Sequence, residues 1–155
     1  MEGITQINQC LRTLSITESE VNKTYYLALL AEGYCSNSEI EEGLNVLAEA
    51  VTAAEKNKEH WYEAELLRLK GNLLLMQDGN TEEVEGWFRR SLELARRQNA
   101  ISFELRTAIS LCKLWQENDR SGEAQELLRN IYEQFSEGFG TKDLQDARSL
   151  LEALQ

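Results

Sequence analysis

The feature that most constrains the fold is an internal spacing of about forty residues in a chain that contains no proline. Ala31, Gly71 and Cys112 each lie inside an apolar, helix-favouring segment, at intervals of 40 and 41 residues. Glycine inside a helix costs roughly 0.5–1 kcal/mol relative to alanine. We therefore interpret Gly71 as a point where a neighbouring helix comes close, and the spacing as a sign of stacked helical units.

Apolar residues recur at helical spacing along the whole chain, and no stretch alternates with the period of a strand. Thr17 with Glu20, and Ser38 with Glu41, fit capping boxes that would start two of the helices. The sequence predicts an all-α fold of about 7–8 helices, over residues 3–15, 20–35, 38–57, 60–77, 81–98, 101–117, 122–135 and 141–154.

Equivalent positions in successive helix pairs carry similar residues. A large residue follows each small one by three positions in the first helices (Tyr34, Leu74, Trp115), and a small or slim residue precedes a large one by four in the second helices (Gly43 and Leu47, Val84 and Phe88, Ala124 and Leu128). This layout resembles the tetratricopeptide repeat, although the family repeats every 34 residues and often carries a closing proline.

The resemblance implies antiparallel helix pairs stacked as a right-handed superhelix, an α-solenoid. We expect one domain over residues 1–155, made of a half-repeat at 3–15, repeats at 20–57, 60–98 and 100–136, and a terminal helix at 141–154.

Three segments carry a closer resemblance: HWYEAELLRLKGNLLL, FRRSLELARRQNAISFELRTAISLCKLWQEND and FSEGFGTKDLQDARSLLEAL. They are similar to the C-terminal helical-repeat region of large bacterial signalling proteins. In that family the region follows an ATPase module and often a nucleotide cyclase or kinase domain. The resemblance implies the tail of such a protein or a relative of it, and it transfers no catalytic residue because the catalytic modules are absent from this sequence.

The charge of the chain restricts its partners. The net charge is −11, distributed as −2 over residues 1–36, −6 over 37–65, +2 over 66–116 and −5 over 117–155. A chain this acidic is a poor ligand for nucleic acid. The longest strongly apolar run, residues 73–76, is too short to span a membrane, and MEGITQINQC does not resemble a secretory signal. We expect a cytoplasmic protein.

Catalytic and metal-binding patterns are missing from the sequence. His60 is the only histidine, and we interpret it as a residue at a helix start that is exposed or packed on Trp61. Cys10, Cys35 and Cys112 form no CxxC pair, and we interpret them as small core or helix-contact residues. Phosphate-binding, nucleophile-elbow and zinc-protease motifs are absent. We expect no enzymatic activity, no cofactor and no metal.

The segment FRRSLELARR looks like a basic patch at first. Glu85, Arg89, Glu93 and Arg97 follow one another at i,i+4 steps, however, which is the ladder of opposite charges that stabilises an exposed helix face. Trp87 lies off the apolar stripe of this helix. We expect it to pack on a neighbouring repeat, with exposure at an interface as the alternative.

The candidate binding site lies on the first helix of each pair, which in tetratricopeptide arrays lines the concave surface. The equivalent positions are Tyr25, Ala28 and Glu32, then Glu65, Arg68 and Asn72, then Arg106, Ile109 and Lys113. Arg68, Asn72 and Arg106 partly resemble a clamp for a peptide carboxylate. The simpler interpretation is that Glu65, Arg68 and Arg106 pair with each other.

Three functional hypotheses follow. The leading one is a non-catalytic module that contacts a protein or peptide partner, or other domains of the same polypeptide. The second is a free-standing adaptor that binds an acidic peptide in the groove near Arg68, Asn72, Arg106 and Lys113. The third is self-association, as a homodimer formed through Trp87 or through the N-terminal half-repeat led by Ile4 and Ile7.

Overall fold

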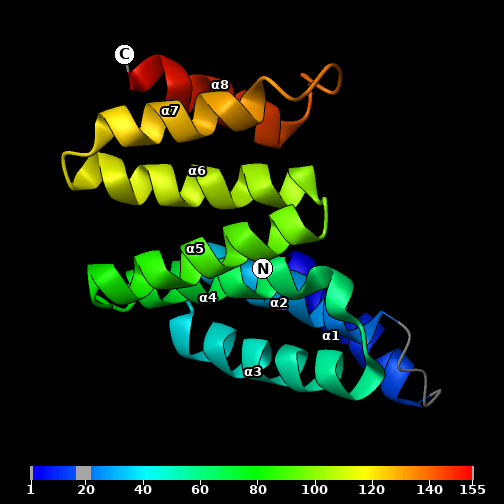
Figure 1. Ribbon diagram of the computed structural model, residues 1–155. Coiled ribbons are helices and arrows are strands. Elements are labelled where there is room, and N and C mark those ends of the chain that lie inside the picture. Colours follow the sequence, from blue (N-terminus) through cyan, green and yellow to red (C-terminus); the bar gives the residue numbers. More distant parts are fainter. Residues whose placement is uncertain (1, 17–21, 155) are drawn as a thin grey trace. The chain divides into compact units, whose positions relative to one another are not determined.

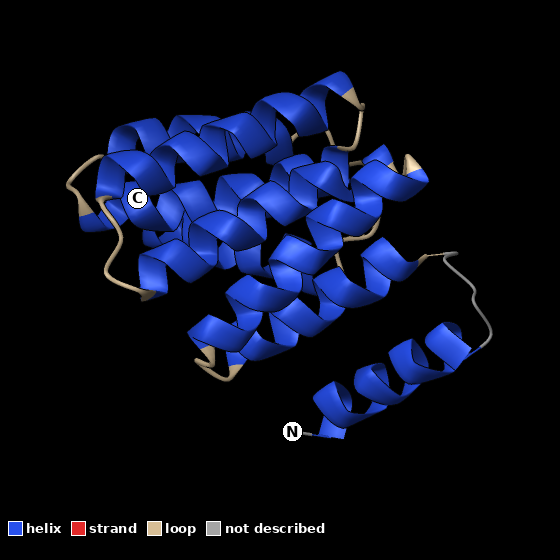
Figure 2. Cartoon of the chain, turned by 90° about the horizontal axis from the view of Figure 1, so that it is seen from below, coloured by secondary structure: helices blue, strands red, loops and turns tan. Residues whose placement is uncertain are grey.

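The computed structural model describes residues 2–16 and 22–154, and within these residues every regular element is a helix (Figures 1 and 2). The elements are α1 (Glu2–Ile16), α2 (Lys23–Ser36), α3 (Ile40–Asn57), the 3-10 helix η1 (His60–Tyr62), α4 (Glu63–Met76), α5 (Thr81–Arg97), α6 (Ile101–Glu117), α7 (Ser121–Tyr132) and α8 (Lys142–Ala153). The all-α prediction is confirmed, and most boundaries agree within three residues.

The first helices of the pairs end in the same turn. Ser38, Asp78 and Asp119 adopt left-handed backbone angles, with φ of 61°, 61° and 58°. The next residue in each case donates its N–H to a carbonyl five residues earlier, from Glu39 to Tyr34 (2.9 Å), Gly79 to Leu74 (2.8 Å) and Arg120 to Trp115 (2.8 Å). This is the Schellman C-cap, which satisfies carbonyls that the helix end leaves without a partner. The three turns are spaced by 40 and 41 residues.

The starts of the helices differ from the capping predictions. The Thr17–Glu20 box lies outside the described residues. The Ser38–Glu41 box is wrong, because Ser38 belongs to the C-terminal turn of α2 and Glu39 occupies the N-cap of α3 without a side-chain bond. Thr141 does stand at the N-cap of α8 in an extended conformation, also without a side-chain bond.

The chain divides into two compact units, which we call unit 1 (Met1–Asn80) and unit 2 (Thr81–Gln155). In unit 1, α1 packs on α2, α2 packs on α3, and α4 packs on both α3 and α2. In unit 2, α5 packs on α6, α6 packs on α7, and α8 packs on both α7 and α6. The boundary falls inside the predicted repeat 60–98, because α4 packs against the helix pair that precedes it.

The apolar stripes read from the sequence form the two cores. Fully or almost fully buried side chains include Leu27, Ala31, Leu47, Leu69 and Leu73 in unit 1 and Val84, Phe88, Leu111, Leu128 and Ile131 in unit 2. Burial of a side chain of this size contributes about 1.5–3 kcal/mol. The equivalent small residues Ala31, Gly71 and Cys112 are all buried, as the spacing predicts.

A close helix approach in unit 1 occurs at Gly43 of α3. A Cβ atom there would lie 2.8 Å from Cδ2 of Leu73 on α4, so only glycine fits without a shift of Leu73. Cys10 on α1, interpreted as a core or helix-contact residue, is instead exposed, and the apolar residues Ala48 and Val51 on α3 are exposed as well. The buried face of α3 runs through Gly43, Leu47, Ala50 and Ala54, and Ala48 and Val51 lie beside it.

Candidate functional site

The residues predicted for the concave face differ in exposure. At the central positions, Ala28, Arg68 and Ile109 are buried, at 1 %, 6 % and 8 % exposure. The outer positions reach solvent to different extents. Tyr25, Glu32, Asn72 and Arg106 are half-buried, Lys113 is exposed and Glu65 is buried. Within each unit, the solvent-accessible residues of the predicted set are therefore found at its outer positions.

Arg68 is held by carboxylates of its own unit. Its Nε donates to Oε1 of Glu65 at 2.9 Å, one turn earlier in α4, and its Nη2 donates to Oε1 of Glu32 on α2 at 3.1 Å. Burial alone would lower the pKa of Arg68, but Glu65 and then Glu32 outweigh it and raise the pKa above its usual value. Of the predicted pairing among Glu65, Arg68 and Arg106, the Glu65–Arg68 part is confirmed. An incoming anion would compete with these two carboxylates for the guanidinium.

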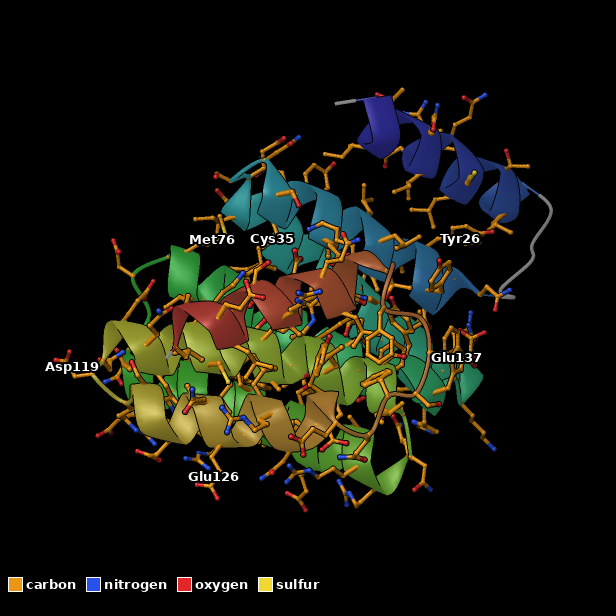
Figure 3. The ribbon with its side chains drawn as sticks, turned by 90° about the horizontal axis from the view of Figure 1, so that it is seen from above. Tyr26, Cys35, Met76, Asp119, Glu126 and Glu137 are labelled. Carbon is orange, nitrogen blue, oxygen red and sulfur yellow. The ribbon has the colours of Figure 1, made fainter. Side chains whose placement is uncertain are left out.

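Two sulfur atoms lie at the far end of the same helices. The Sγ of Cys35, near the end of α2, is 3.5 Å from the Sδ of Met76, the last residue of α4 (Figure 3). Burial raises the pKa of the Cys35 thiol, although the nearby charge of Arg68 opposes the change. A thiol in this state is a packing group and a poor nucleophile.

In unit 2 the corresponding face is partly covered by the last helix. Arg106 on α6 approaches Asp143 in the first turn of α8, with 3.8 Å between Nε and Oδ2. This is a long, partly exposed ion pair and adds little stability. Lys113, two turns further along α6, is exposed. The two units therefore present different chemistry at equivalent positions.

The best-defined charged cluster of unit 2 surrounds Trp115. The Cζ atoms of Arg120 and Arg89 lie 4.6 and 5.3 Å from the indole centroid, a geometry for cation–π attraction. Glu85 bridges both cations, accepting from Arg120 at 2.8 Å and from Arg89 at 2.8 Å, while Arg120 also pairs with Glu123 at 2.9 Å. Partial burial alone would raise the pKa of Glu85, but these hydrogen bonds lower it overall.

The cluster around Trp115 includes the first two residues of the charge ladder predicted for α5, Glu85 and Arg89. The first step of the ladder, Glu85 with Arg89, is confirmed. Glu85 also ties α5 to α7 through Arg120, which lies 35 residues away. Trp87 is half-buried, and the guanidinium of Arg90 lies 4.7 Å from its ring centroid, so it packs with its own helix rather than standing exposed.

Sequence reasoning missed a cluster of four aromatic rings in unit 1. Tyr25 stacks on Trp61, with 6.1 Å between centroids and 27° between planes, and it meets Tyr26 and Tyr62 edge-on at 5.6 and 5.4 Å. Tyr62 is buried, whereas 49 % of Trp61 is exposed. The available signal was the recurrence of adjacent aromatic pairs, Tyr25-Tyr26 and Trp61-Tyr62.

His60 is exposed, one of the two environments predicted for it, and its Nδ1 lies 2.7 Å from Oε1 of Glu63. Among residues 2–16 and 22–154, no group of three or more His, Cys, Asp or Glu side chains is placed to hold a metal ion. Of the helices in these ranges, none combines the length and the apolar character needed to cross a membrane.

Comparisons with models of known protein families and with curated proteins find no match for this chain.

Proposed function

We propose that this chain is a non-catalytic helical-repeat module that mediates protein contacts. The observation that carries the proposal is the recurrence of one helix-ending turn, on Ser38, Asp78 and Asp119 after the first helices and on Lys58 and Asn99 after the second, with each set at intervals of 40 or 41 residues. Ala31, Gly71 and Cys112 follow the same intervals and are all buried. Agreement between a sequence period and a backbone period is typical of repeated supersecondary units.

The packing order of the two units supports the same proposal. Each unit contains four main helices, and the last of them packs on the second and the third. In a tetratricopeptide-like stack, the first helix of one pair covers both helices of the pair before it. Such stacks bury one face of each pair and leave long surfaces available to partners, which is how repeat proteins serve as binding scaffolds.

We propose partner contacts for each unit by itself, at the outer positions of α2 and α4 in unit 1 and of α6 in unit 2. Tyr25, Glu32 and Asn72 are accessible in unit 1 and Lys113 is accessible in unit 2, whereas Arg68, held by Glu65, joins α4 to α2 through Glu32. The alternative of an acidic peptide held by Arg68 gains no support from this geometry, because two carboxylates already neutralise the guanidinium. The partner would be a separate protein or another domain of the same polypeptide.

The resemblance to bacterial signalling proteins leads to the second part of the proposal, a cytoplasmic regulatory tail or a relative of one. An antibody raised against this chain and applied to an extract of the native cells tests this point directly. A band much larger than 17.8 kDa supports the tail. A band of that size supports a free-standing adaptor.

Photo-crosslinking tests the proposed binding surface. A photoreactive amino acid is placed at Asn72 or Lys113, and matched controls carry it at Ala48 on α3 or Glu126 on α7, which are both exposed. We expect discrete protein adducts from Asn72 and Lys113 after irradiation in cells, with the partner identified by mass spectrometry. Adducts that are the same from all four positions, or absent from Asn72 and Lys113, contradict the proposal.

A further inference from the structure

A cleft of about 500 Å³ lies between α1 and α2. Tyr26 contributes its wall on α2, and the wall on α1 consists of Gln6, Gln9, Cys10, Thr13 and Leu14 (Figure 3 labels Tyr26). None of these side chains carries a charge at neutral pH, and the volume is typical of ligand-binding clefts. Gln6 and Gln9 are exposed, and a side-chain amide offers both a donor and an acceptor, as a peptide unit does.

One residue of the cleft wall also belongs to the aromatic rings of unit 1. The ring of Tyr26, in the cleft wall, contacts the ring of Tyr25, and Tyr25 in turn stacks on Trp61. We call Tyr25, Tyr26 and Trp61 the ring cluster. Trp61 exposes 49 % of its surface, although tryptophan has the largest side chain of the apolar amino acids. Tryptophan and tyrosine on a surface are the residues most often central to protein interfaces.

Charge indicates what would bind there. Unit 1 has six Lys and Arg against thirteen Asp and Glu, a net charge of −7, whereas unit 2 has ten against fourteen, a net charge of −4. Glu59 and Glu63 flank the segment that carries Trp61, and Lys23 near Tyr25 is paired with Glu49 at 3.2 Å. A cationic partner is therefore attracted to this unit, and an acidic one is repelled.

We propose that the α1–α2 cleft and the ring cluster form one docking surface for a basic, extended peptide segment. The backbone of the segment lies in the cleft and exchanges hydrogen bonds with Gln6 and Gln9. An arginine or lysine side chain of the segment stacks on Trp61, the aromatic residue that attracts cations most strongly. This surface shares Tyr25 with the outer positions of α2 but otherwise consists of other residues, and the inference does not depend on the function proposed for those positions.

Fluorescence anisotropy of short labelled peptides tests the inference on the full chain. The probe is Gly-Ser-Arg-Ser-Arg-Ser-Gly with fluorescein at its N-terminus, and the controls replace both arginines by glutamine or by glutamate. We expect the arginine peptide to bind, with an affinity that falls as salt is added because the attraction is partly between charges. The glutamine peptide should bind more weakly, and the glutamate peptide should not bind.

Substitution of Trp61 locates the site. Loss of one cation–π contact at a partly exposed ring corresponds to about a two- to fivefold loss of affinity. We expect Trp61→Ala to weaken binding by at least this factor, and Trp61→Phe to restore part of it. The matched control is Phe139→Ala in unit 2, because Phe139 is 48 % exposed and also packs against one tyrosine ring. That variant should bind as the original protein does.

The cleft has its own test. Gln6→Leu with Gln9→Leu should weaken binding of the arginine peptide, and bound peptide should slow alkylation of Cys10, which is exposed in the same wall. Circular dichroism confirms that each variant remains helical. Three results overturn the inference: no binding of the arginine peptide at millimolar concentration, equal binding of the glutamate peptide, or equal losses for Trp61→Ala and Phe139→Ala.

Discussion

Units 1 and 2 pack their helices in the same order but differ in the kind of polar contact that they bury. In unit 1 a charged pair lies inside: Glu65 is 1 % exposed, Arg68 is 6 % exposed, and Arg68 also joins α4 to α2 through Glu32. In unit 2 the interior pair is neutral, with Ser91 and Thr107 sharing a hydrogen bond of 2.8 Å between α5 and α6. The ion pairs of unit 2 each include a partner that reaches solvent: Arg89 and Arg120 around Trp115, and the exposed Arg96, which binds the buried Glu104 at 2.7 Å.

The difference shows that one packing arrangement accepts two kinds of polar helix contact. A buried ion pair requires both ions to leave water, and their attraction only roughly offsets that cost. A pair of hydroxyl groups leaves water at a much smaller cost and attracts less strongly. Unit 1 should therefore be sensitive to the loss of one partner, and unit 2 should respond weakly to equivalent changes.

The largest effect is expected for Glu65→Ala. Glu65 and Glu32 both accept hydrogen bonds from the buried guanidinium of Arg68, and this change removes Glu65. Removal of one member of a buried pair typically costs about 3–5 kcal/mol. Hydrogen exchange followed by mass spectrometry should show faster exchange in α2 and α4, with little change in α6 and α7.

A double variant separates the charge from the packing. Glu65→Leu with Arg68→Met removes both ions and keeps most of the apolar volume, so we expect it to recover much of the stability lost in Glu65→Ala. If the double variant is less stable than Glu65→Ala, the ion pair itself stabilises unit 1, and the comparison between the two units has to be revised.

A smaller effect is expected for Thr107→Val in unit 2. Valine has nearly the same shape as threonine but removes the hydrogen bond to Ser91, at a cost of about 1–2 kcal/mol. Exchange should accelerate in α5 and α6 and stay unchanged in unit 1. A loss as large as that of Glu65→Ala would show that the neutral contact is as important as the charged one.

The smallest effect on stability is expected for the ion pairs of Glu85, and they lose their contribution only at acidic pH. Because the pKa of Glu85 in the folded chain lies below the ordinary value of 4.5, its ion pairs contribute full stability above pH 4.5. That contribution is lost as the pH falls through the lowered pKa. It should stay below about 1 kcal/mol, since solvent screens Arg89 and Arg120. Urea titrations at several pH values should show the original protein and Glu85→Gln converging at low pH, and a constant gap would contradict this assignment.

Local patterns were sufficient to place the helices. The α6 prediction, residues 101–117, agrees at both ends, because its stripe of apolar residues repeats every 3.6 positions and Asn118-Asp119 breaks the helix. The Ser38–Glu41 capping box was predicted from the same kind of local pattern. It is wrong because the spacing Ser-x-x-Glu also occurs by chance outside capping boxes. Left-handed angles at a serine depend on the Schellman bonds of the whole turn.

The candidate site was only partly predictable. The Glu65–Arg68 pair follows from i,i+3 spacing on one helix. That Arg68 also binds Glu32, 36 residues away, depends on how α4 packs against α2. The ring cluster depends on the same packing, because Tyr25 and Trp61 belong to elements that meet only when the helices stack. A stripe on one helix indicates that its face is buried but does not identify the residue opposite.

The sequence by itself determined the helices, the turns between them, the spacing of 40 and 41 residues and the inward positions of Ala31, Gly71 and Cys112. These are properties of neighbouring residues, and backbone hydrogen bonds within four or five positions decide them. Tertiary structure alone decided that Arg68 is neutralised, that two arginines cover Trp115 and that Trp61 is left half exposed. Those outcomes depend on distances between separate helices, which only packing determines.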